Sequence, residues 1–172
     1  LVVKRPWPSM IRTIWNDPER FVKSYFTSFN KMLYTSSDWA GRDEDGYFFI
    51  LGRTDDVINV AGHRLGTREI EESISSHPNV AEVAVVGVAD QLKGQVAIAF
   101  AVLKDPNVDA LKLEGEIMKL VDNQLGAVAR PARVRFVTLL PKTRSGKLLR
   151  RAIQAVCEGR DPGDLATIED PS

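Results

Sequence analysis

The hydrophobic pattern of the chain changes repeatedly between two periods. Runs rich in valine and other β-branched residues predict strands at 57–60, 79–88, 96–103 and 133–137. A short polar segment joins the second and third runs, so we expect them to pair as neighbouring antiparallel strands.

Between these strands, apolar residues recur every three or four positions, as they do on one face of a helix. The first helix follows Thr67, its expected N-cap, and must end before Pro78. Two more helices are predicted, one from about Asp109 and one over 148–157, the second with Leu149, Ile153 and Val156 facing inward. This order of elements favours an α+β fold, in which a small mixed or antiparallel sheet is flanked by helices.

The first 37 residues have a weaker pattern. Asp17-Pro18 predicts a helix start, and Phe21, Tyr25 and Phe29 then recur at helical spacing. Because this stretch supplies few partners for its aromatic side chains, we expect its apolar face to be partly exposed or covered by another chain. Residues 38–51 predict a β-hairpin around an Asp-Gly turn.

The amino-acid composition mainly excludes some classes of partner and an internal disulfide. The 172 residues, 44% of them hydrophobic, can bury the core of one ordinary domain or of a small domain plus part of another. Because 23 basic and 23 acidic residues balance, no net charge steers the chain to nucleic acid or to an anionic membrane. The single cysteine, Cys157, excludes an internal disulfide and is expected to be a buried small apolar residue.

Location and completeness are further expectations. No apolar run reaches the length of a membrane span, and the first residues lack the order of a signal peptide, so a cytoplasmic protein is expected. The chain has no initiator methionine and begins within an apparent strand, which suggests a piece of a longer protein.

Two charged motifs carry the candidate chemistry. The first extends from Gly52 to Glu71 and has the order turn, strand, glycine turn, helix. The second is Pro141-Lys142-Thr143-Arg144-Ser145-Gly146-Lys147, which places Lys147 on a polar loop before a helix. A long cation on a mobile loop can stabilise charge on phosphoryl oxygens. The second motif is not a P-loop, because Leu148 stands where a magnesium-binding Ser or Thr would be required.

A competing interpretation is a non-catalytic α+β binding module with a basic patch. Its surface would be a cluster of cations for nucleic acid or an acidic protein, formed by Lys142, Arg144, Lys147, Arg150 and Arg151. The zero net charge and the absence of interleaved aromatic residues argue against this interpretation.

Together the two motifs resemble the hinge motif and the catalytic-lysine loop of the adenylate-forming enzymes, the superfamily of acyl-CoA synthetases, luciferases and peptide-synthetase adenylation domains. The resemblance covers nearly the whole chain and is greatest to short-chain acyl-CoA synthetases, first those that activate propionate and next those that activate acetate. It implies that residues 1–54 are the incomplete end of a large N-terminal domain, and that 55–172 form a mobile C-terminal domain with its hinge at 55–56. The chain alone should therefore not turn over substrate.

The resemblance also implies roles for individual residues. Lys147 would be the catalytic lysine of adenylation. Asp38 would accept hydrogen bonds from both ribose hydroxyls of the nucleotide, with Arg53 beside it, and Arg64 would contact the ATP phosphates. Asp55 would be the hinge residue about which the C-terminal domain turns.

Substrates and partners follow from the same resemblance. Gly62, with His63, would lie beside the pantetheine arm of CoA, although Asp122 stands where relatives often carry a basic residue that meets a CoA phosphate. ATP or AMP, Mg²⁺, CoA and a small carboxylate would bind the intact enzyme, while no metal-ligating residue, nucleic acid or membrane partner is expected. Acylation of Lys147 would remove its charge, which implies a lysine acetyltransferase and a deacylase as partners.

Overall fold

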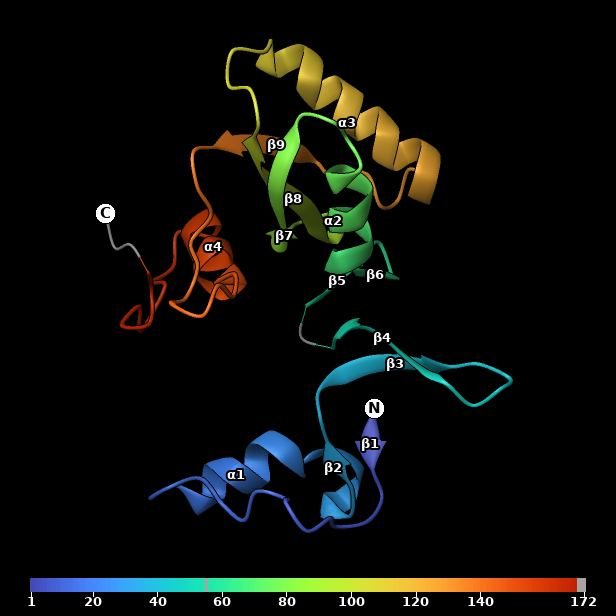
Figure 1. Ribbon diagram of the computed structural model, residues 1–172, viewed down its shortest axis with the longest axis vertical. Coiled ribbons are helices and arrows are strands. Elements are labelled where there is room, and N and C mark those ends of the chain that lie inside the picture. Colours follow the sequence, from blue (N-terminus) through green and yellow to red (C-terminus); the bar gives the residue numbers. More distant parts are fainter. Residues whose placement is uncertain (55, 170–172) are drawn as a thin grey trace. The chain divides into compact units, whose positions relative to one another are not determined.

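A computed structural model describes residues 1–54 and 56–169 (Figure 1). The chain divides into two compact units, Leu1–Asp55 and Asp56–Ser172, which we describe separately. No helix of the described residues is both long and apolar enough to cross a bilayer. In chain order the elements are β1 Val2–Val3, α1 Pro18–Tyr25, a 3-10 turn Ser28–Lys31, β2 Tyr34–Thr35, β3 Asp38–Arg42, β4 Phe48–Arg53, β5 Val57–Val60, β6 His63–Gly66, α2 Thr67–Ser75, β7 Val80–Asp90, β8 Gly94–Leu103, α3 Ala110–Leu125, β9 Arg133–Val137 and α4 Arg150–Cys157.

The first unit consists of α1 and two antiparallel strand pairs. Strand β1 pairs with β2, and β3 pairs with β4 in the predicted hairpin. Helix α1 begins as the sequence predicts, because the Asp17 side chain caps it by accepting from the Arg20 N–H (3.0 Å). Tyr25 stacks on Tyr34, with the ring centroids 5.0 Å apart. These contacts form a small aromatic cluster and not a deep core.

Several apolar side chains of this unit face solvent. Trp15 is 88% exposed and Phe29 is 60% exposed. The predicted helical stripe ends early, because α1 stops at Tyr25 and Phe29 adopts a positive φ of 61° in the following turn. The expectation of a partly exposed apolar face is confirmed by these side chains.

The second unit is built on a mixed sheet whose central strand is β8. Strand β7 pairs with β8 along its whole length, antiparallel as predicted, with Val83 opposite Ala101 and Ala89 opposite Gln95. On the other edge of β8, β9 pairs in parallel over Ile98–Val102, and β5 joins at Gly94. The described residues of this unit therefore form one five-stranded sheet.

Alternation along β7 produces two cores, one on each face of the sheet. Val83 and Val85 pack on the side of α2 and α3, whereas Ala84 and Val86 pack on the side of α4 (Figure 1). Sheet and helices thus form three layers, and the predicted α+β class is confirmed. The larger core contains the side chains of Ile58, Ile70, Ile74, Leu113, Ile117, Val121 and Val134.

Five local predictions differ from the structure. Thr67 is the first helical residue of α2, since Gly66 occupies the N-cap. The stretch after Gly62 is not a simple turn, because His63–Gly66 forms β6. Helix α4 begins at Arg150, and Val156, expected to face inward, is 66% exposed. Cys157 is half-buried, and burial, followed by the nearby charge of Glu158, raises the pKa of its thiol.

Candidate functional site

Lys147 lies in the loop between β9 and α4, which we call the lysine loop (residues 138–149). Thr143 organises its turn. The Thr143 N–H donates to the Lys147 carbonyl (2.8 Å), and Thr143 Oγ1 accepts from the Lys147 N–H (3.1 Å). The Lys147 side chain is exposed, and among the described residues no group hydrogen-bonds or ion-pairs with its ammonium. The loop therefore fixes the backbone of Lys147 and leaves its amine available to a ligand.

A half-buried ion pair fixes the C-terminal end of the lysine loop. Arg150, the first residue of α4, binds Glu71 of α2 through both Nε (3.1 Å) and Nη2 (2.8 Å). Glu71 Oε1 also accepts from the Val85 N–H of β7 (2.8 Å). Burial lowers the pKa of Arg150, but the hydrogen bonds and charge of Glu71 outweigh burial, so the pKa lies above its ordinary value. One carboxylate thus joins α2, β7 and α4.

A second ion pair fixes the loop closer to Lys147. Lys142 Nζ lies 2.7 Å from Glu82 Oε1 on β7. The sequence did not indicate a role for Glu71 or Glu82, because their partners lie 79 and 60 positions away. No local pattern carries such information.

Replacement of Glu71 by alanine is expected to lower the free energy of unfolding by about 2 kcal/mol, because it leaves a half-buried guanidinium and the Val85 N–H without their acceptor. Urea denaturation of the chain measures this loss. Glu72→Ala is the matched control on the same helix, since Glu72 pairs with Arg68 in solvent and should contribute less than about 0.5 kcal/mol. Equal losses for the two variants would contradict the assignment.

Gly62 lies in the tight turn between β5 and β6. Val60 and His63 pair across the turn, and both central residues have positive φ, 49° at Ala61 and 86° at Gly62. These angles are those of a type I′ hairpin turn. Apart from its two chain neighbours, no described residue has an atom within 4 Å of the position that a Cβ at Gly62 would take. His63 and the following Arg64 are exposed on β6.

A cavity of about 760 Å³ opens beside this turn. Its floor includes Val60, Ala61 and Ala97, and three cations, Lys93, Lys119 and Arg130, contribute to its wall. Arg130 also lies 3.5 Å from Asp122, the acid found in place of a basic residue. The lining of the cavity therefore carries three cations, of which Arg130 is paired with Asp122.

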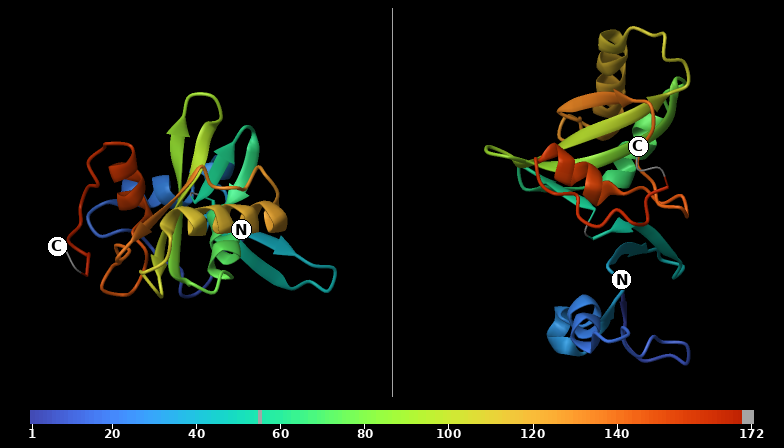
Figure 2. Two further views of the ribbon diagram at one scale, coloured as in Figure 1. Left: turned by 90° about the horizontal axis from the view of Figure 1, so that it is seen from above. Right: turned by 90° about the vertical axis from the view of Figure 1, so that its left-hand side faces the viewer.

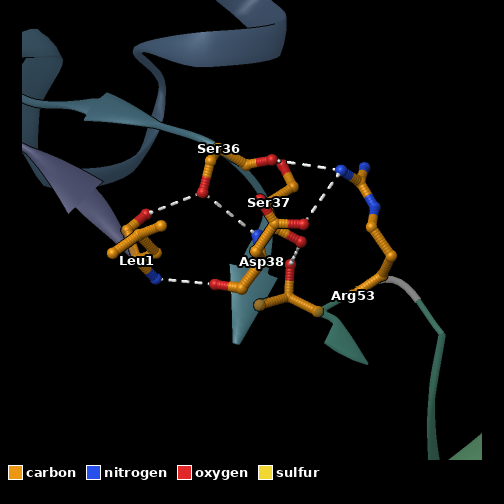
Figure 3. Close-up of polar contacts among 6 residues, drawn as sticks. Leu1, Ser36, Ser37, Asp38 and Arg53 are labelled. Atoms are coloured by element: carbon orange, nitrogen blue, oxygen red, sulfur yellow. Dashed lines mark hydrogen bonds and ion pairs between the residues drawn. The ribbon is translucent and has the colours of Figure 1, made fainter. Parts of the chain in front are cut away.

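Asp38 and Arg53 meet in the first unit, where β3 and β4 place them opposite each other (Figure 3). Arg53 Nη1 lies 3.5 Å from Asp38 Oδ1 and donates to the Ser36 carbonyl at 3.1 Å. The Ser36 hydroxyl accepts from the Asp38 N–H (3.3 Å). The Asp38 side chain is 28% exposed, so its carboxylate remains accessible to a diol.

The predicted site residues thus fall into separate groups. Asp38 and Arg53 lie together in the first unit, whereas Gly62, His63 and Arg64 share one hairpin of the second unit and Lys147 lies on its loop. The predicted hinge residue, Asp55, lies outside the described residues. Among the described residues, no three His, Cys, Asp or Glu side chains are grouped as metal ligands would be.

Comparison with known proteins identifies relatives of the whole chain. The AMP-binding enzyme C-terminal domain matches residues 69–147. Propionate–CoA ligase of Salmonella typhimurium is 64% identical over 178 aligned positions, which cover 100% of this chain and 28% of that protein. Acetyl-coenzyme A synthetase of Pyrobaculum aerophilum is 52% identical, over 99% of this chain and 25% of that protein. The chain therefore spans little more than a quarter of the relatives it matches.

Solved structures of enzymes of the same superfamily superimpose on this chain. The crystal structure of ATP-bound MatB from Rhodopseudomonas palustris superimposes with a TM-score of 0.74 at 30% identity, over 87% of this chain and 28% of that one. The anthranilate CoA ligase AuaEII in complex with anthranoyl-AMP gives a TM-score of 0.73 at 30% identity, over 85% and 28%. The chain belongs to the adenylate-forming superfamily and corresponds to the C-terminal part of its short-chain acyl-CoA synthetases.

Proposed function

We propose that this chain is the C-terminal part of an ATP-dependent propionate–CoA ligase. In the first half-reaction a propionate oxygen attacks the α-phosphorus of ATP, and pyrophosphate leaves with the bonding electrons to give propionyl-AMP. In the second, the CoA thiolate attacks the acyl carbon and AMP leaves. The observation that carries the proposal is the exposed ammonium of Lys147 on a loop whose backbone is fixed on both sides.

Lys147 acts in the first half-reaction. Negative charge grows on the phosphoryl oxygens as propionate attacks, and an ammonium held near them stabilises the transition state. Arg64, exposed on β6, supplies a second cation to the ATP phosphates, and its planar fork suits a phosphate better than lysine does. Mg²⁺ enters with ATP as part of the substrate.

Asp38 and Arg53 hold the nucleotide. Two carboxylate oxygens can accept from the two vicinal hydroxyls of ribose, and Arg53 keeps the Asp38 carboxylate oriented. These residues belong to the first unit, which we assign to the end of a large N-terminal domain. We assign the pivot about which the second unit turns between half-reactions to Asp55, which lies outside the described residues.

The β5–β6 turn serves the second half-reaction. Gly62 leaves space for the pantetheine arm of CoA, and His63 lies on the same turn. Lys93 and Lys119 line the cavity beside this turn and suit the phosphates of CoA, and Arg130 in the same lining pairs with the acid at Asp122.

The basic-patch alternative loses support from the ion pairs. Of its five cations, Lys142 is paired with Glu82 and Arg150 with Glu71. A surface on which two of five cations are paired within the fold is a weaker electrostatic footprint for nucleic acid. We therefore favour the ligase.

Exposure of Lys147 also supports control by acylation. A lysine acetyltransferase could reach the amine, and the acylated residue would lack the charge that adenylation requires. A deacylase would restore activity.

The test uses the full-length enzyme that contains this chain. With ATP and propionate but no CoA, pyrophosphate should form in an amount close to that of the enzyme, and added CoA should release propionyl-CoA and AMP. Acetate is the control substrate, and kcat/KM for propionate should exceed that for acetate. A preference for acetate would favour acetate–CoA ligase, and no carboxylate-dependent pyrophosphate formation with either acid would overturn the proposal.

A further inference from the structure

The segment after α4 has no regular secondary structure, yet it pairs with the lysine loop. We call Asp161–Glu169 the tail. The Arg144 N–H donates to the Thr167 carbonyl (3.1 Å), and the Glu169 N–H donates to the Lys142 carbonyl (2.9 Å). These bonds form an antiparallel bridge between Thr143 and Ile168. Figures 1 and 2 show the red tail beside the orange loop near α4. The sequence of the tail, which is acidic, gave no sign of this contact.

The bridge occurs at the residue that organises the Lys147 turn. Thr143 holds the Lys147 backbone through two hydrogen bonds, and its Oγ1 lies 3.0 Å from the Ser145 hydroxyl. The neighbours of Thr143 on both sides bond the tail. The backbone segment that presents Lys147 therefore lies between its own turn and the tail.

Apolar side chains fasten the tail to the α4 face of the sheet. Pro162, Leu165 and Ile168 recur every third residue, and all three are half-buried. They line a nearly apolar hollow of about 270 Å³ together with residues of β8, β9, α4 and the lysine loop, including Phe100, Val137, Leu140 and Ile153. At the start of the tail, the Arg160 N–H donates to the Ala155 carbonyl (2.8 Å). The tail is thus anchored to β8, β9 and α4 as well as to the loop that it contacts.

We propose that the tail is a positioning element for the adenylation half-reaction, which holds the lysine loop in the shape that presents Lys147. This inference rests on the proposed function of Lys147. The tail touches neither substrate nor the amine, and it acts by limiting the conformations of Lys142–Arg144. Catalysis that depends on one placed cation is sensitive to such limits, because displacement by about 1 Å can cost on the order of a hundredfold in rate. The second half-reaction does not use Lys147 and needs no ordered loop.

The test compares two neighbouring substitutions in the full-length enzyme. Ile168→Asp places a charge in the apolar hollow and should detach the tail, whereas Ala166→Asp adds the same charge at an exposed position. Ile168→Asp should lower kcat for pyrophosphate formation about tenfold with little change in the KM for ATP. Thioester formation from supplied propionyl-AMP should keep its rate in Ile168→Asp. The conservative variant Ile168→Val should retain the wild-type rate of adenylation.

Hydrogen exchange separates failure of the tail from failure of the assigned activity. The amides of Gly146 and Lys147 should exchange faster in Ile168→Asp than in Ala166→Asp, whatever the reaction catalysed. Unchanged adenylation, or equal loss in both half-reactions, would overturn the positioning role. If these amides exchange faster while the wild-type enzyme forms no carboxylate-dependent pyrophosphate, the contact stands and its assignment to adenylation is wrong.

Discussion

Lys147→Ala in the full-length enzyme is expected to lower the rate of pyrophosphate formation by about 10² to 10³, the usual effect of removing one group that stabilises transition-state charge. Conversion of supplied propionyl-AMP and CoA to propionyl-CoA should keep its rate, because the role proposed for the lysine is confined to adenylation. Pyrophosphate release from ATP and thioester formation from propionyl-AMP, measured separately, give the two rates.

Arg144→Ala is the matched control for this experiment. Arg144 is an exposed cation on the same loop, and the loop uses its backbone N–H and not its guanidinium. If loss of positive charge in general explained the defect, Arg144→Ala would reproduce it. Full adenylation by Lys147→Ala would show that Lys147 is an ordinary surface charge, and the assignment would have to be abandoned.

Gly62→Leu should produce the opposite defect. Among the described residues, a Cβ at Gly62 has open space around it, so we expect a leucine side chain to project into the space assigned to the pantetheine arm. Thioester formation from propionyl-AMP should fall by about a hundredfold, while pyrophosphate formation continues. The same pair of assays measures both rates.

Backbone strain must be separated from obstruction in this variant. Gly62 has a φ of 86°, where leucine is strained by about 1–2 kcal/mol. Gly159→Leu is the control, because Gly159 has a φ of 65° and also has open space around it, but lies at the end of α4. Thermal unfolding should show comparable destabilisation of both variants. A similar loss of thioester formation in Gly159→Leu would attribute the Gly62 effect to strain.

Local pattern predicted much of the fold. The valine-rich runs became β7 and β8, and α3 begins after Asp109, whose carboxylate caps it by accepting from the Leu111 and Lys112 N–H groups. Each of these features depends on residues close together in the sequence. The parallel pairing of β9 with β8 does not depend on neighbouring residues. It places Arg133 opposite Ile98, and helix α3 separates the two strands in the sequence.

In the candidate site, too, contacts between residues close in the sequence could be predicted and contacts between distant residues could not. Asp38 and Arg53 come together through the register of one predicted hairpin. The contacts that support the lysine loop join distant segments, Glu71 to Arg150 and Ile168 to Thr143. Neither contact can be predicted from a local sequence pattern. Val156 shows the same limit in the core: helical spacing placed it inward, but Ala152 and Ala155 occupy the buried face of α4. The roles of Lys147, Arg64 and Gly62 stay predictions that the half-reactions above can test.

The shared sheet also has a mechanical consequence. Strand β8 pairs with β7 on one edge and with β9 and β5 on the other, so the Gly62 hairpin and the support of the lysine loop belong to one hydrogen-bonded framework. We expect this framework to move as one rigid body that carries both the Gly62 hairpin and the lysine loop. If the second unit turns about the proposed hinge, the rotation that brings one end to the substrate would withdraw the other, and this would set the order of the two chemical steps. The rigidity of the sheet would then determine that adenylation precedes thioester formation.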